Sequence, residues 1–520
     1  MPLNELLPKA AKLHPQQEAV VCGKTRLTYR QFAGRVWRLC GGLRRLGLQR
    51  NDRVAILHEN CHVFLEAYFA AAHSGLILVP LNHRLSPKEL AVILDDSGAR
   101  VMIAHESFKE KVKDLTGLVR SMERVVWSPG QSTLESGEKF MMYEEMLREE
   151  EETVPPELSI RDDDVAHLYY TSGTTGRPKG VMLTHKNVKS HALGTIAELH
   201  LTDRDRWFHV APLFHLADAW ATFAITWAGG KHILCPSFEP ARVLRLIDEE
   251  RVTLTNLIPT MLNMMIHHPD SAKHDYSSLR VLLSGGAPIA PEVVRKIIET
   301  FRCDYIQTYG MTETSPYLTL SILKSRLRDL PDEEQLGFKA STGREFINVS
   351  LKVVDEQGRE VARDGRQVGE IIVKGDIVTP GYWNLDQETG AAIKDGWLRT
   401  GDLAVVNEEE YVTIVDRKKD MIITGGENVY STEVENVLYT HPAVLEAAVI
   451  GVPDPKWGEA VKACLVLKPG REATDQEIIR FCKEHLAHYK APKSVEFLET
   501  LPRTGSGKIY KKGLREPHLR

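Results

Sequence analysis

The 520-residue sequence has only seven cysteines, and no two of them form a CxxC pair. A zinc site of the usual ligand spacing is therefore not expected. The cysteines are an odd and scattered set, which argues against a disulfide framework and suits a reducing compartment. The set is Cys22, Cys40, Cys61, Cys235, Cys303, Cys464 and Cys482.

Long apolar runs are also missing. Residues 1–17 carry charges and prolines and lack the apolar centre of a signal peptide. Apolar stretches such as 67–80 are too short or too interrupted to span a bilayer. We therefore expect a cytoplasmic protein without a transmembrane segment, a monomer or a homodimer, and leave peripheral membrane contact open.

An excess of charge of one sign is absent as well. The formal net charge is -5 and the pI is about 6.5, which gives no electrostatic reason to expect a nucleic-acid partner. The composition is that of a globular protein, with 42% hydrophobic and 26% charged residues. Because 520 residues exceed one ordinary core, two to four structural units are expected.

Helical and strand patterns alternate in the first half. Thr28 and Gln31 have the spacing of a capping box, and Gly47 suits the end of the helix that follows. One face of that helix would carry Phe32, Val36, Leu39, Leu43 and Leu46. Strand-like segments follow at 54–57 and 76–79, so we expect an α/β fold with largely parallel sheets. The acidic, proline-containing stretch 144–164 is interpreted as a surface linker.

The last hundred residues have the pattern of a small α+β unit. Two strands are expected at 444–452 and 460–467, and a helix capped by Thr474 and Glu477 is expected to run to about His488. The predicted organisation is a large N-terminal region with mixed and parallel sheets in several subdomains, followed by a small, mobile domain. Its boundaries are 1–416 for the large region, 417–420 for a hinge and 421–520 for the small domain.

The segment YYTSGTTGRPKG, residues 169–180, is the most informative one. A loop of Gly, Ser and Thr can expose successive N–H groups, and Lys179 adds a positive charge. These properties suit a triphosphate, although no Gly-Lys-Ser/Thr triplet closes the loop as in a Walker motif. Taken alone, the segment leaves a flexible surface turn as the alternative interpretation.

Seven further motifs accompany this loop in a fixed order. They are APLFH (211–215), SGGAP (284–288), YGMTET (309–314), GEIIVKGDIVTPGYW (369–383), TGD (400–402), DRKKDMIITGGENVY (416–430) and PRTGSGK (502–508). With them, the whole chain resembles the adenylate-forming superfamily of acyl-CoA synthetases, peptide-synthetase adenylation domains and beetle luciferases. The motifs are most similar to those of fatty-acyl-CoA synthetases.

The resemblance implies an ATP and Mg²⁺ site at the boundary of the two domains. Glu313 would hold Mg²⁺, Thr312 would contact the α-phosphate, and Asp402 and Arg417 would bind the ribose. The residues implied to bind ATP are Thr171, Ser172, Gly173, Thr174, Thr175, Gly176, Lys179, Gly286, Ala287, Pro288, Tyr309, Gly310, Met311, Thr312, Asp402, Arg417 and Lys508. The acyl pocket would include His215, Gly285, Gly286 and Gly310.

The resemblance also implies two half-reactions, which the small domain separates by rotating. Lys508 would bridge the carboxylate and the α-phosphate as negative charge develops, and Lys419 would be the hinge. Coenzyme A would then meet Gly425, Gly426, Glu427, Trp457, Tyr489, Lys490 and Lys493. The implied catalytic set is Lys508, Thr312, Glu313 and His215, and no base for the CoA thiol stands out apart from His215 as a candidate.

The acid itself is predicted from the absence of charge. The segment NLIPTMLNM, 256–264, offers no partner for an amine or a second carboxylate, so amino acids are disfavoured. Asp218 does not match the position of an ammonium-binding residue and is interpreted as solvated or as a helix cap. A medium- or long-chain aliphatic acid is expected, with aryl or arylalkanoic acids as the alternative. Met261, Met264 and Met265 fit either an adaptable acyl wall or a plain apolar helix.

Three other functions remain for comparison. A non-catalytic acyl-nucleotide-binding protein would lack Lys508, Glu313 or Asp402, and all three are present. An enzyme that loads a carrier protein would have to use a separate carrier, because only twelve residues follow Lys508. A luciferase-like oxidation is disfavoured because the C-terminus Pro-His-Leu-Arg is no peroxisomal signal.

Overall fold

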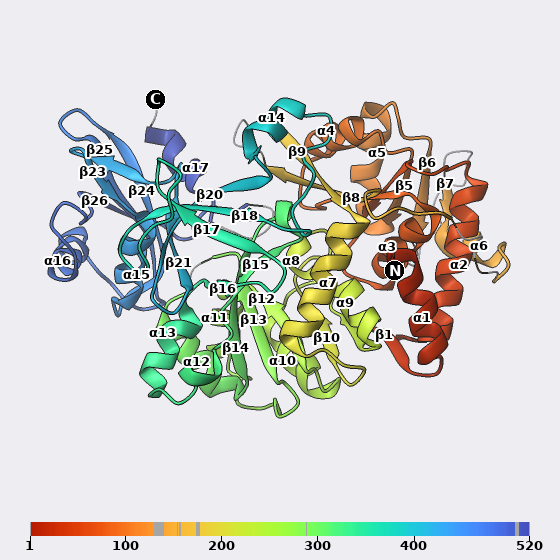
Figure 1. The fold of residues 1–520 in the computed structure, drawn as a ribbon, viewed down its shortest axis with the longest axis horizontal. Coiled ribbons are helices and arrows are strands. Elements are labelled where there is room, and N and C mark those ends of the chain that lie inside the picture. Colours follow the sequence, from red (N-terminus) through yellow and green to blue (C-terminus); the bar gives the residue numbers. More distant parts are fainter. Residues whose placement is uncertain are drawn as a thin grey trace.

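A computed structural model gives the structure of residues 2–128, 140–152, 154, 158–172, 177–287, 289–504 and 509–518, with Ser172 described by its backbone only. Three sheets organise these residues, and the helices pack around them (Figure 1). The expected α/β architecture, with a large N-terminal region and a smaller C-terminal domain, is confirmed. No helix in the described part of the chain combines the length and apolar character needed to cross a bilayer.

The first sheet has seven strands in the order β7-β6-β5-β3-β4-β8-β9. Its pairs are parallel except for the last, in which β8 and β9 are antiparallel. The bounds are β3 (Arg53–Leu57), β4 (Ile77–Pro80), β5 (Val101–His105), β6 (Arg124–Ser128), β7 (Phe140–Met142), β8 (Val165–Ser172) and β9 (Pro178–Thr184).

The second sheet has fourteen strands, and β10 to β14, together with β1, form its parallel part. Its order is β17-β18-β20-β21-β16-β15-β14-β13-β12-β10-β11-β1-β2, with β19 beside β20. The bounds are β1 (Glu18–Cys22), β2 (Thr25–Thr28), β10 (Arg206–His209), β11 (Lys231–Leu234), β12 (Leu254–Leu257), β13 (Val281–Gly285), β14 (Asp304–Gly310), β15 (Tyr317–Leu320), β16 (Gly343–Glu345), β17 (Ser350–Val354), β18 (Gly369–Lys374), β19 (Ile393–Lys394), β20 (Trp397–Val406) and β21 (Tyr411–Arg417).

The third sheet belongs to the small domain at the left of Figure 1. Its order is β23-β22-β25-β24, with β26 beside β25. The bounds are β22 (Ile422–Thr424), β23 (Glu427–Val429), β24 (Val444–Asp454), β25 (Gly458–Leu467) and β26 (Ser494–Phe497). The last strand of the large sheet thus ends at Arg417 and the first strand of the small sheet begins at Ile422, on either side of the turn that contains Lys419.

Both helices that the capping patterns predict are present. Thr28 and Gln31 cap α2 and Thr474 and Glu477 cap α16, each with both reciprocal hydrogen bonds. The bounds are α1 (Leu6–Leu13), α2 (Tyr29–Arg45), α3 (His62–Ser74), α4 (Pro87–Ser97), α5 (Lys109–Leu118), α6 (Tyr143–Arg148), α7 (His185–Leu199), α8 (Leu216–Ala219), α9 (Ala221–Ala228), α10 (Pro240–Glu249), α11 (Pro259–Ile266), α12 (Pro291–Phe301), α13 (Asp332–Ala340), α14 (Asp386–Ala392), α15 (Ser431–Thr440), α16 (Asp475–His485) and α17 (Lys511–Arg515), with short 3₁₀ turns η1 (Leu3–Glu5), η2 (Glu106–Phe108), η3 (Thr312–Thr314), η4 (Ser325–Leu327) and η5 (Glu516–His518).

The acidic stretch differs in part from the predicted linker. Residues 143–148 form α6, which packs against α2. The glutamates that follow pair with arginines of α2: Glu150 with Arg45 and Glu152 with Arg38. The run of like charge is therefore compensated by basic side chains on the adjoining helix, which the local sequence does not reveal.

The apolar segment after Asn256 forms helix α11, and its methionines differ in exposure. Met264 is 54% exposed, Met261 is partly buried, and Met265 is fully buried in the core beside Leu262. The apolar helix is thus observed, and an acyl wall built from these methionines stays a prediction.

Candidate functional site

The first cluster of predicted site residues joins the ends of β14 and β21 to the middle of β20 in the large sheet. Asp402 in β20 is directly opposite Arg417 in β21, and Arg417 Nε lies 3.1 Å from Asp402 Oδ1. Tyr309, near the end of β14, donates a hydrogen bond of 2.7 Å from its hydroxyl to Asp402 Oδ2. Each carboxylate oxygen of Asp402 keeps lone pairs that can accept further hydroxyl groups.

The electrostatics of this cluster keep Tyr309 a donor. Burial, and after it the Asp402 carboxylate, raises the pKa of Tyr309 well above its ordinary value. Asp402 is itself only 5% exposed, and the half-exposed Arg417 guanidinium provides the positive charge beside it. The arrangement presents a fixed carboxylate and a planar donor group side by side, the chemistry that recognises a vicinal diol or a polyol.

A second cluster joins the phosphate-loop motif to the rest of the large region. The backbone of 180–182 meets 381–383: Met182 N donates to Gly381 O at 3.1 Å and Trp383 N donates to Gly180 O at 2.7 Å. As a result Lys179 Nζ lies 5.1 Å from the ring centroid of Tyr382. The motif near residue 180 and the motif that ends at 383 are therefore one structural unit.

Glu313 completes this second cluster from the short turn η3. Its Oε1 accepts a hydrogen bond of 2.9 Å from the hydroxyl of Tyr382, and the residue is 7% exposed. Burial raises the pKa of Glu313. A divalent cation would compensate this buried negative charge, and a carboxylate is the hard oxygen ligand that Mg²⁺ prefers, so the residue fits the ion.

Tyr382 was given no role by sequence reasoning. It lies in the GEIIVKGDIVTPGYW motif, but that motif alone does not reveal that its hydroxyl would reach Glu313. The signal that identifies it is the pairing of β9 with residues 381–383, which brings together segments 200 residues apart.

The glycines assigned to the acyl pocket lie at close backbone contacts. A Cβ on Gly310 would lie 1.8 Å from the carbonyl oxygen of Pro316, and a Cβ on Gly285 would lie 2.3 Å from Thr308 Oγ1. Gly286 has a φ of +87°. Strand packing therefore already requires glycine at 285 and 310, whatever ligand lies beside them.

His215, Ala287, Met311 and Thr312 follow the ends of β10, β13 and β14. The half-buried His215 precedes α8, and its Nδ1 accepts a hydrogen bond of 3.2 Å from Ala217 N. Gln307 donates to Ala287 O at 2.9 Å, and Met311 N donates to Thr314 Oγ1 at 3.2 Å. Thr312 begins η3, next to Glu313.

Asp218 departs from its predicted state. The structure buries it completely, with hydrogen bonds from Trp207 Nε1 at 3.0 Å and His209 Nδ1 at 2.7 Å. It is therefore neither solvated nor an N-terminal cap of α8, a position that His215 takes. The partners lie nine and eleven residues earlier, a spacing that no helix or strand periodicity indicates.

The residues predicted to contact coenzyme A lie on the small domain. Gly425 N donates to Trp457 O at 2.8 Å, and a Cβ on Gly425 would lie 2.9 Å from the Trp457 ring. The indole is 42% exposed. Lys490 Nζ is 2.7 Å from Glu433, so a phosphate would have to compete with this ion pair. The other predicted contacts, Glu427, Tyr489 and Lys493, are exposed.

Contacts from both domains surround the predicted hinge residue. Lys419 lies in the turn after β21, where Lys418 N donates to Gly401 O at 2.9 Å. Asp420 pairs with Arg515 at 2.9 Å. Just before the turn, Asp416 accepts a hydrogen bond of 2.6 Å from Ser431 N.

Several predicted residues lie outside the described part of the chain. They are Gly173, Thr174, Thr175, Gly176, Pro288 and Lys508, together with the side chain of Ser172. Thr171 is described and pairs with Lys179 across β8 and β9.

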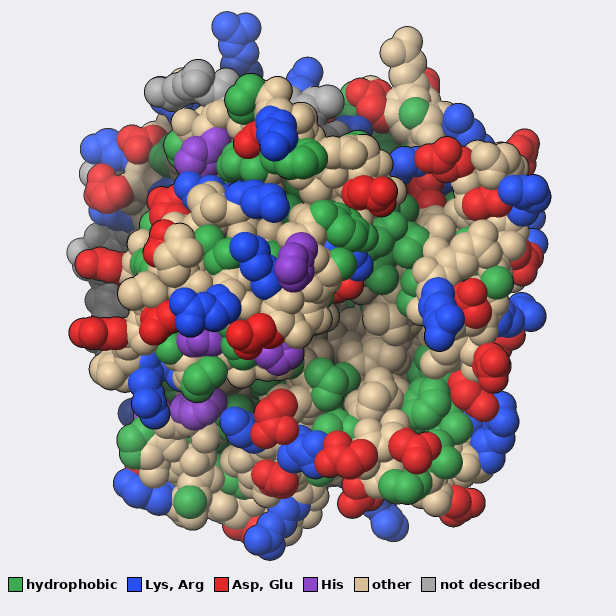
Figure 2. All heavy atoms as spheres, turned by 90° about the vertical axis from the view of Figure 1, so that its left-hand side faces the viewer, with side chains coloured by type: hydrophobic (Ala, Val, Ile, Leu, Met, Phe, Trp, Pro, Cys, Tyr) green, Lys and Arg blue, Asp and Glu red, His purple; other side chains and the backbone are tan. Residues whose placement is uncertain are grey.

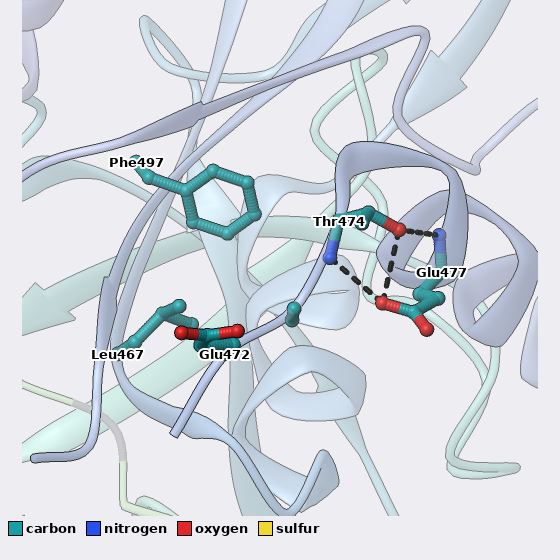
Figure 3. A pocket seen from close by; sticks show the side chains of 6 residues that line it. Leu467, Glu472, Thr474, Glu477 and Phe497 are labelled. Atoms are coloured by element: carbon teal, nitrogen blue, oxygen red, sulfur yellow. Dashed lines mark hydrogen bonds between the residues drawn. The ribbon is translucent and has the colours of Figure 1, made fainter. Parts of the chain in front are cut away.

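Figure 2 shows the molecule from the side on which the small domain lies. Its surface is hollowed near the centre, and charged side chains of both signs are scattered over it. A separate surface pocket lies at the start of α16, where the capping box of Thr474 and Glu477 forms one side (Figure 3). Glu472 and Glu477 both contribute to this pocket, and two carboxylates do not favour a phosphate ligand.

Comparison with known proteins matches both parts of the chain to family models. Residues 7–383 match the model described as AMP-binding enzyme, and residues 433–508 match AMP-binding enzyme C-terminal domain. A feruloyl-CoA synthase from Amycolatopsis sp is 40% identical over 98% of this chain and 97% of its own length. A long-chain-fatty-acid–CoA ligase from Thermus thermophilus is 38% identical over 99% and 95%.

A solved structure shares the whole fold. The anthranilate CoA ligase AuaEII, in complex with anthranoyl-AMP, superposes with a TM-score of 0.90 at 27% identity, covering 100% of this chain and 97% of that one.

Proposed function

From the premise that the chain belongs to the family of AMP-binding enzymes and is an AMP-forming acid–CoA ligase, we propose two things. They are the acid that the enzyme activates and the residues that act on each substrate. The enzyme uses ATP, Mg²⁺ and coenzyme A. In the first half-reaction a carboxylate oxygen attacks the α-phosphorus of ATP, and pyrophosphate leaves. In the second, the CoA sulfur attacks the acyl carbon, and AMP leaves as the thioester forms.

Asp402, Arg417 and Tyr309 are proposed to bind the nucleoside. The Asp402 carboxylate would accept the two ribose hydroxyls through its remaining lone pairs, while Tyr309 holds one of its oxygens at 2.7 Å. Arg417, 3.1 Å from the same carboxylate, would donate to a ribose oxygen. Gly286, Ala287, Gly310 and Met311 would line the adenine side, as the family resemblance implies.

Glu313, Thr312 and Lys179 are proposed to act on the phosphates. The buried Glu313 would hold Mg²⁺, and Tyr382 would keep its carboxylate oriented through the 2.9 Å hydrogen bond. Lys179 and the loop 171–176 would contact the β- and γ-phosphates. Bound Mg²⁺ would supply positive charge that neutralises the leaving pyrophosphate.

The acid is proposed to be a monocarboxylic acid with an apolar skeleton, aliphatic and of medium or long chain. The observation that carries this proposal is the state of Asp218, which is completely buried with both carboxylate oxygens hydrogen-bonded to Trp207 and His209. It therefore has no exposed oxygen to offer an ammonium group. Residues 256–265 also contain no charge that could meet a second carboxylate.

An aryl or arylalkanoic acid is the second candidate, and the aromatic side chains near α8 favour it. Trp220 and Tyr317 lie with ring centroids 5.3 Å apart, and Trp220 Nε1 and Asn256 Nδ2 donate to the same oxygen, Ala217 O. Among the described residues, Tyr317 Oη and Asn256 Oδ1 are buried without a hydrogen-bond partner. They could meet a phenolic hydroxyl, and the relative that is 40% identical is a feruloyl-CoA synthase.

Coenzyme A is proposed to bind against the small domain. Gly425 and Gly426, with φ angles of +61° and +86°, would allow the pantetheine close to the backbone, and Glu427 would lie beside it. Trp457, Tyr489, Lys490 and Lys493 are proposed as contacts to the nucleotide end. Cytoplasmic location, a monomeric or homodimeric state and the lack of a nucleic-acid partner stay predictions.

The products provide the first test of the proposed function. With the acid, ATP, Mg²⁺ and coenzyme A, we expect AMP and pyrophosphate to appear in equal amounts, whereas without coenzyme A the AMP moiety stays in the acyl-adenylate. The reason is that the attack falls on the α-phosphorus. Chromatographic detection of nucleotides, with a phosphate assay as control, measures this outcome. Acid-dependent ADP and inorganic phosphate would contradict it.

A panel of acids provides the second test. For straight-chain acids, kcat/KM is expected to rise with length, by at most about 0.8 kcal/mol of transition-state binding per buried methylene, and then to fall where the pocket ends. ATP–pyrophosphate exchange across fatty, cinnamic, benzoic and amino acids measures the profile, and repeating it with coenzyme A tests the second half-reaction. If activity is low and independent of chain length for aliphatic acids and has a sharp optimum at a cinnamate or benzoate, the enzyme is an aryl-acid ligase.

A further inference from the structure

The segment between β10 and α8 is held at both ends by one buried carboxylate. Trp207 and His209 belong to β10, and Asp218 belongs to α8; all three side chains have no exposed surface. Asp218 Oδ1 accepts from Trp207 Nε1 at 3.0 Å and Oδ2 accepts from His209 Nδ1 at 2.7 Å. The intervening residues 210–215, which carry His215, therefore form a closed loop.

The hydrogen bonds continue inward from His209. His209 Nε2 lies 2.9 Å from His232 Nδ1, and His232 Nε2 lies 2.9 Å from Thr226 Oγ1. Because the carboxylate can only accept, His209 Nδ1 must carry a hydrogen, and its Nε2 then accepts from His232. His232 in turn accepts from the Thr226 hydroxyl. This pattern gives every ring nitrogen of the two histidines a partner, and burial holds the pKa of His232 well below its usual range.

A second buried side chain fixes the middle of the same loop. Asn60 is 3% exposed and lies just before α3. Its Nδ2 donates to Ala211 O at 2.8 Å and to His209 O at 3.3 Å, and its Oδ1 accepts from Leu213 N at 2.8 Å. The backbone of 209–213 is thus held along its length, and Asp218 fixes the part that Asn60 does not reach.

We propose that Asp218 is a positioning residue that sets the acyl end of the site through α8. The residue before it, Ala217, donates its N–H to His215 Nδ1 and accepts at its carbonyl from Trp220 and Asn256. The position of Asp218 therefore determines where the His215 ring and the Trp220–Asn256 pair lie. This inference rests on the proposed function, in which His215 and these neighbours line the acid-binding pocket.

Two substitutions distinguish the negative charge of Asp218 from the hydrogen bonds that its side chain accepts. In Asp218→Asn the amide can donate to His209 Nδ1 and accept from Trp207, if both histidines exchange tautomers and Thr226 becomes the final acceptor. All four hydrogen bonds then survive: the one from Trp207 keeps its direction, and the other three are reversed. In Asp218→Ala, Trp207 Nε1 and His209 Nδ1 both lose their partner at residue 218, so α8 is free to shift.

The matched control is Asp205→Ala. Asp205 precedes β10 at its other end, is 4% exposed, and accepts from Arg280 Nε at 2.8 Å and from Thr253 Oγ1 at 3.0 Å. Its loss removes a comparable buried carboxylate without touching residues 210–218. This variant is expected to lower the melting temperature while leaving the KM for the acid within about twofold of the parent enzyme.

The experiment measures KM for the acid, KM for ATP and kcat for pyrophosphate exchange. Asp218→Ala is expected to raise the acid KM by roughly tenfold or more with the ATP KM nearly unchanged, because displaced pocket groups lose their alignment with the acid. Asp218→Asn is expected to restore the acid KM to within about threefold. Nitrogen-15 NMR of the histidine rings should show the exchanged tautomers in Asp218→Asn.

Several outcomes would overturn the proposal. An Asp218→Ala enzyme with a lower melting temperature but parental KM for the acid, like Asp205→Ala, would leave Asp218 a purely structural residue. If Asp218→Ala does not fold, Trp207→Phe provides the test, because it removes one of the two donors to Asp218. A KM for the acid equal to that of the parent enzyme contradicts the proposal, and a rise in this KM alone supports it. If His215→Ala leaves the acid KM unchanged while Asp218→Ala raises it, the assignment of His215 fails and the positioning role of Asp218 stands.

Discussion

Replacing Lys508 with alanine is expected to slow acyl-adenylate formation by roughly 10²- to 10³-fold while thioester formation from supplied acyl-AMP stays close to normal. In this motif a lysine ammonium would stabilise the negative charge that grows on the α-phosphate during attack. That charge no longer develops once the adenylate exists. The C-terminal family model extends to this lysine, in the motif PRTGSGK.

The measurement compares ATP–pyrophosphate exchange with the single-turnover conversion of synthetic acyl-AMP to acyl-CoA. Lys512→Ala is the matched control, because Lys512 is an exposed lysine on α17, four residues further on. The control should leave both half-reactions within about twofold of the parent enzyme. If Lys508→Ala lowers the rates of the two half-reactions equally, the role proposed for Lys508 in adenylate formation is wrong.

Lys419→Pro is expected to separate the half-reactions in the opposite sense, sparing the adenylate step and lowering thioester formation by at least roughly tenfold. Proline fixes φ near about -65°, so it opposes the backbone change that a rotating small domain needs at this turn. Rapid-quench measurement of acyl-AMP in the presence of coenzyme A should show the intermediate accumulating.

Lys419→Ala is the control for this experiment, since it removes the side chain and leaves φ free. It should turn over at close to the parental rate. Equal loss of both steps in a folded Lys419→Pro enzyme would place the hinge elsewhere. Loss of neither step would mean that thioester formation requires no rotation about this turn.

Much of the fold was predictable because it is encoded locally. The capping boxes at Thr28 and Thr474 fix where α2 and α16 begin, and short apolar runs predict β3 and β4. The strand order was not predictable. β16 lies between β15 and β21, a pairing that depends on tertiary packing and not on the residues of β16 themselves.

The site residues also fall into those that the sequence predicts and those that only tertiary contacts reveal. Motifs identified Asp402, Arg417 and Glu313, and the structure joins the first two in an ion pair and places Glu313 beside Tyr382. Tyr382 and the buried state of Asp218 were missed, because in each case the partner lies far away or at an irregular spacing along the chain. Side-chain roles that depend on such contacts require coordinates.

The contact between β9 and residues 381–383 also determines when the enzyme can acquire its site during synthesis. Lys179 leaves the ribosome some 200 residues before Tyr382, the residue whose ring it faces. A nascent chain that ends before residue 383 therefore has β8 and β9 but not the segment that covers them. Contacts of such long sequence separation form slowly, since the loop entropy must be lost first. Until then the edge of β9 lacks its partner segment, and an unpaired strand edge favours aggregation.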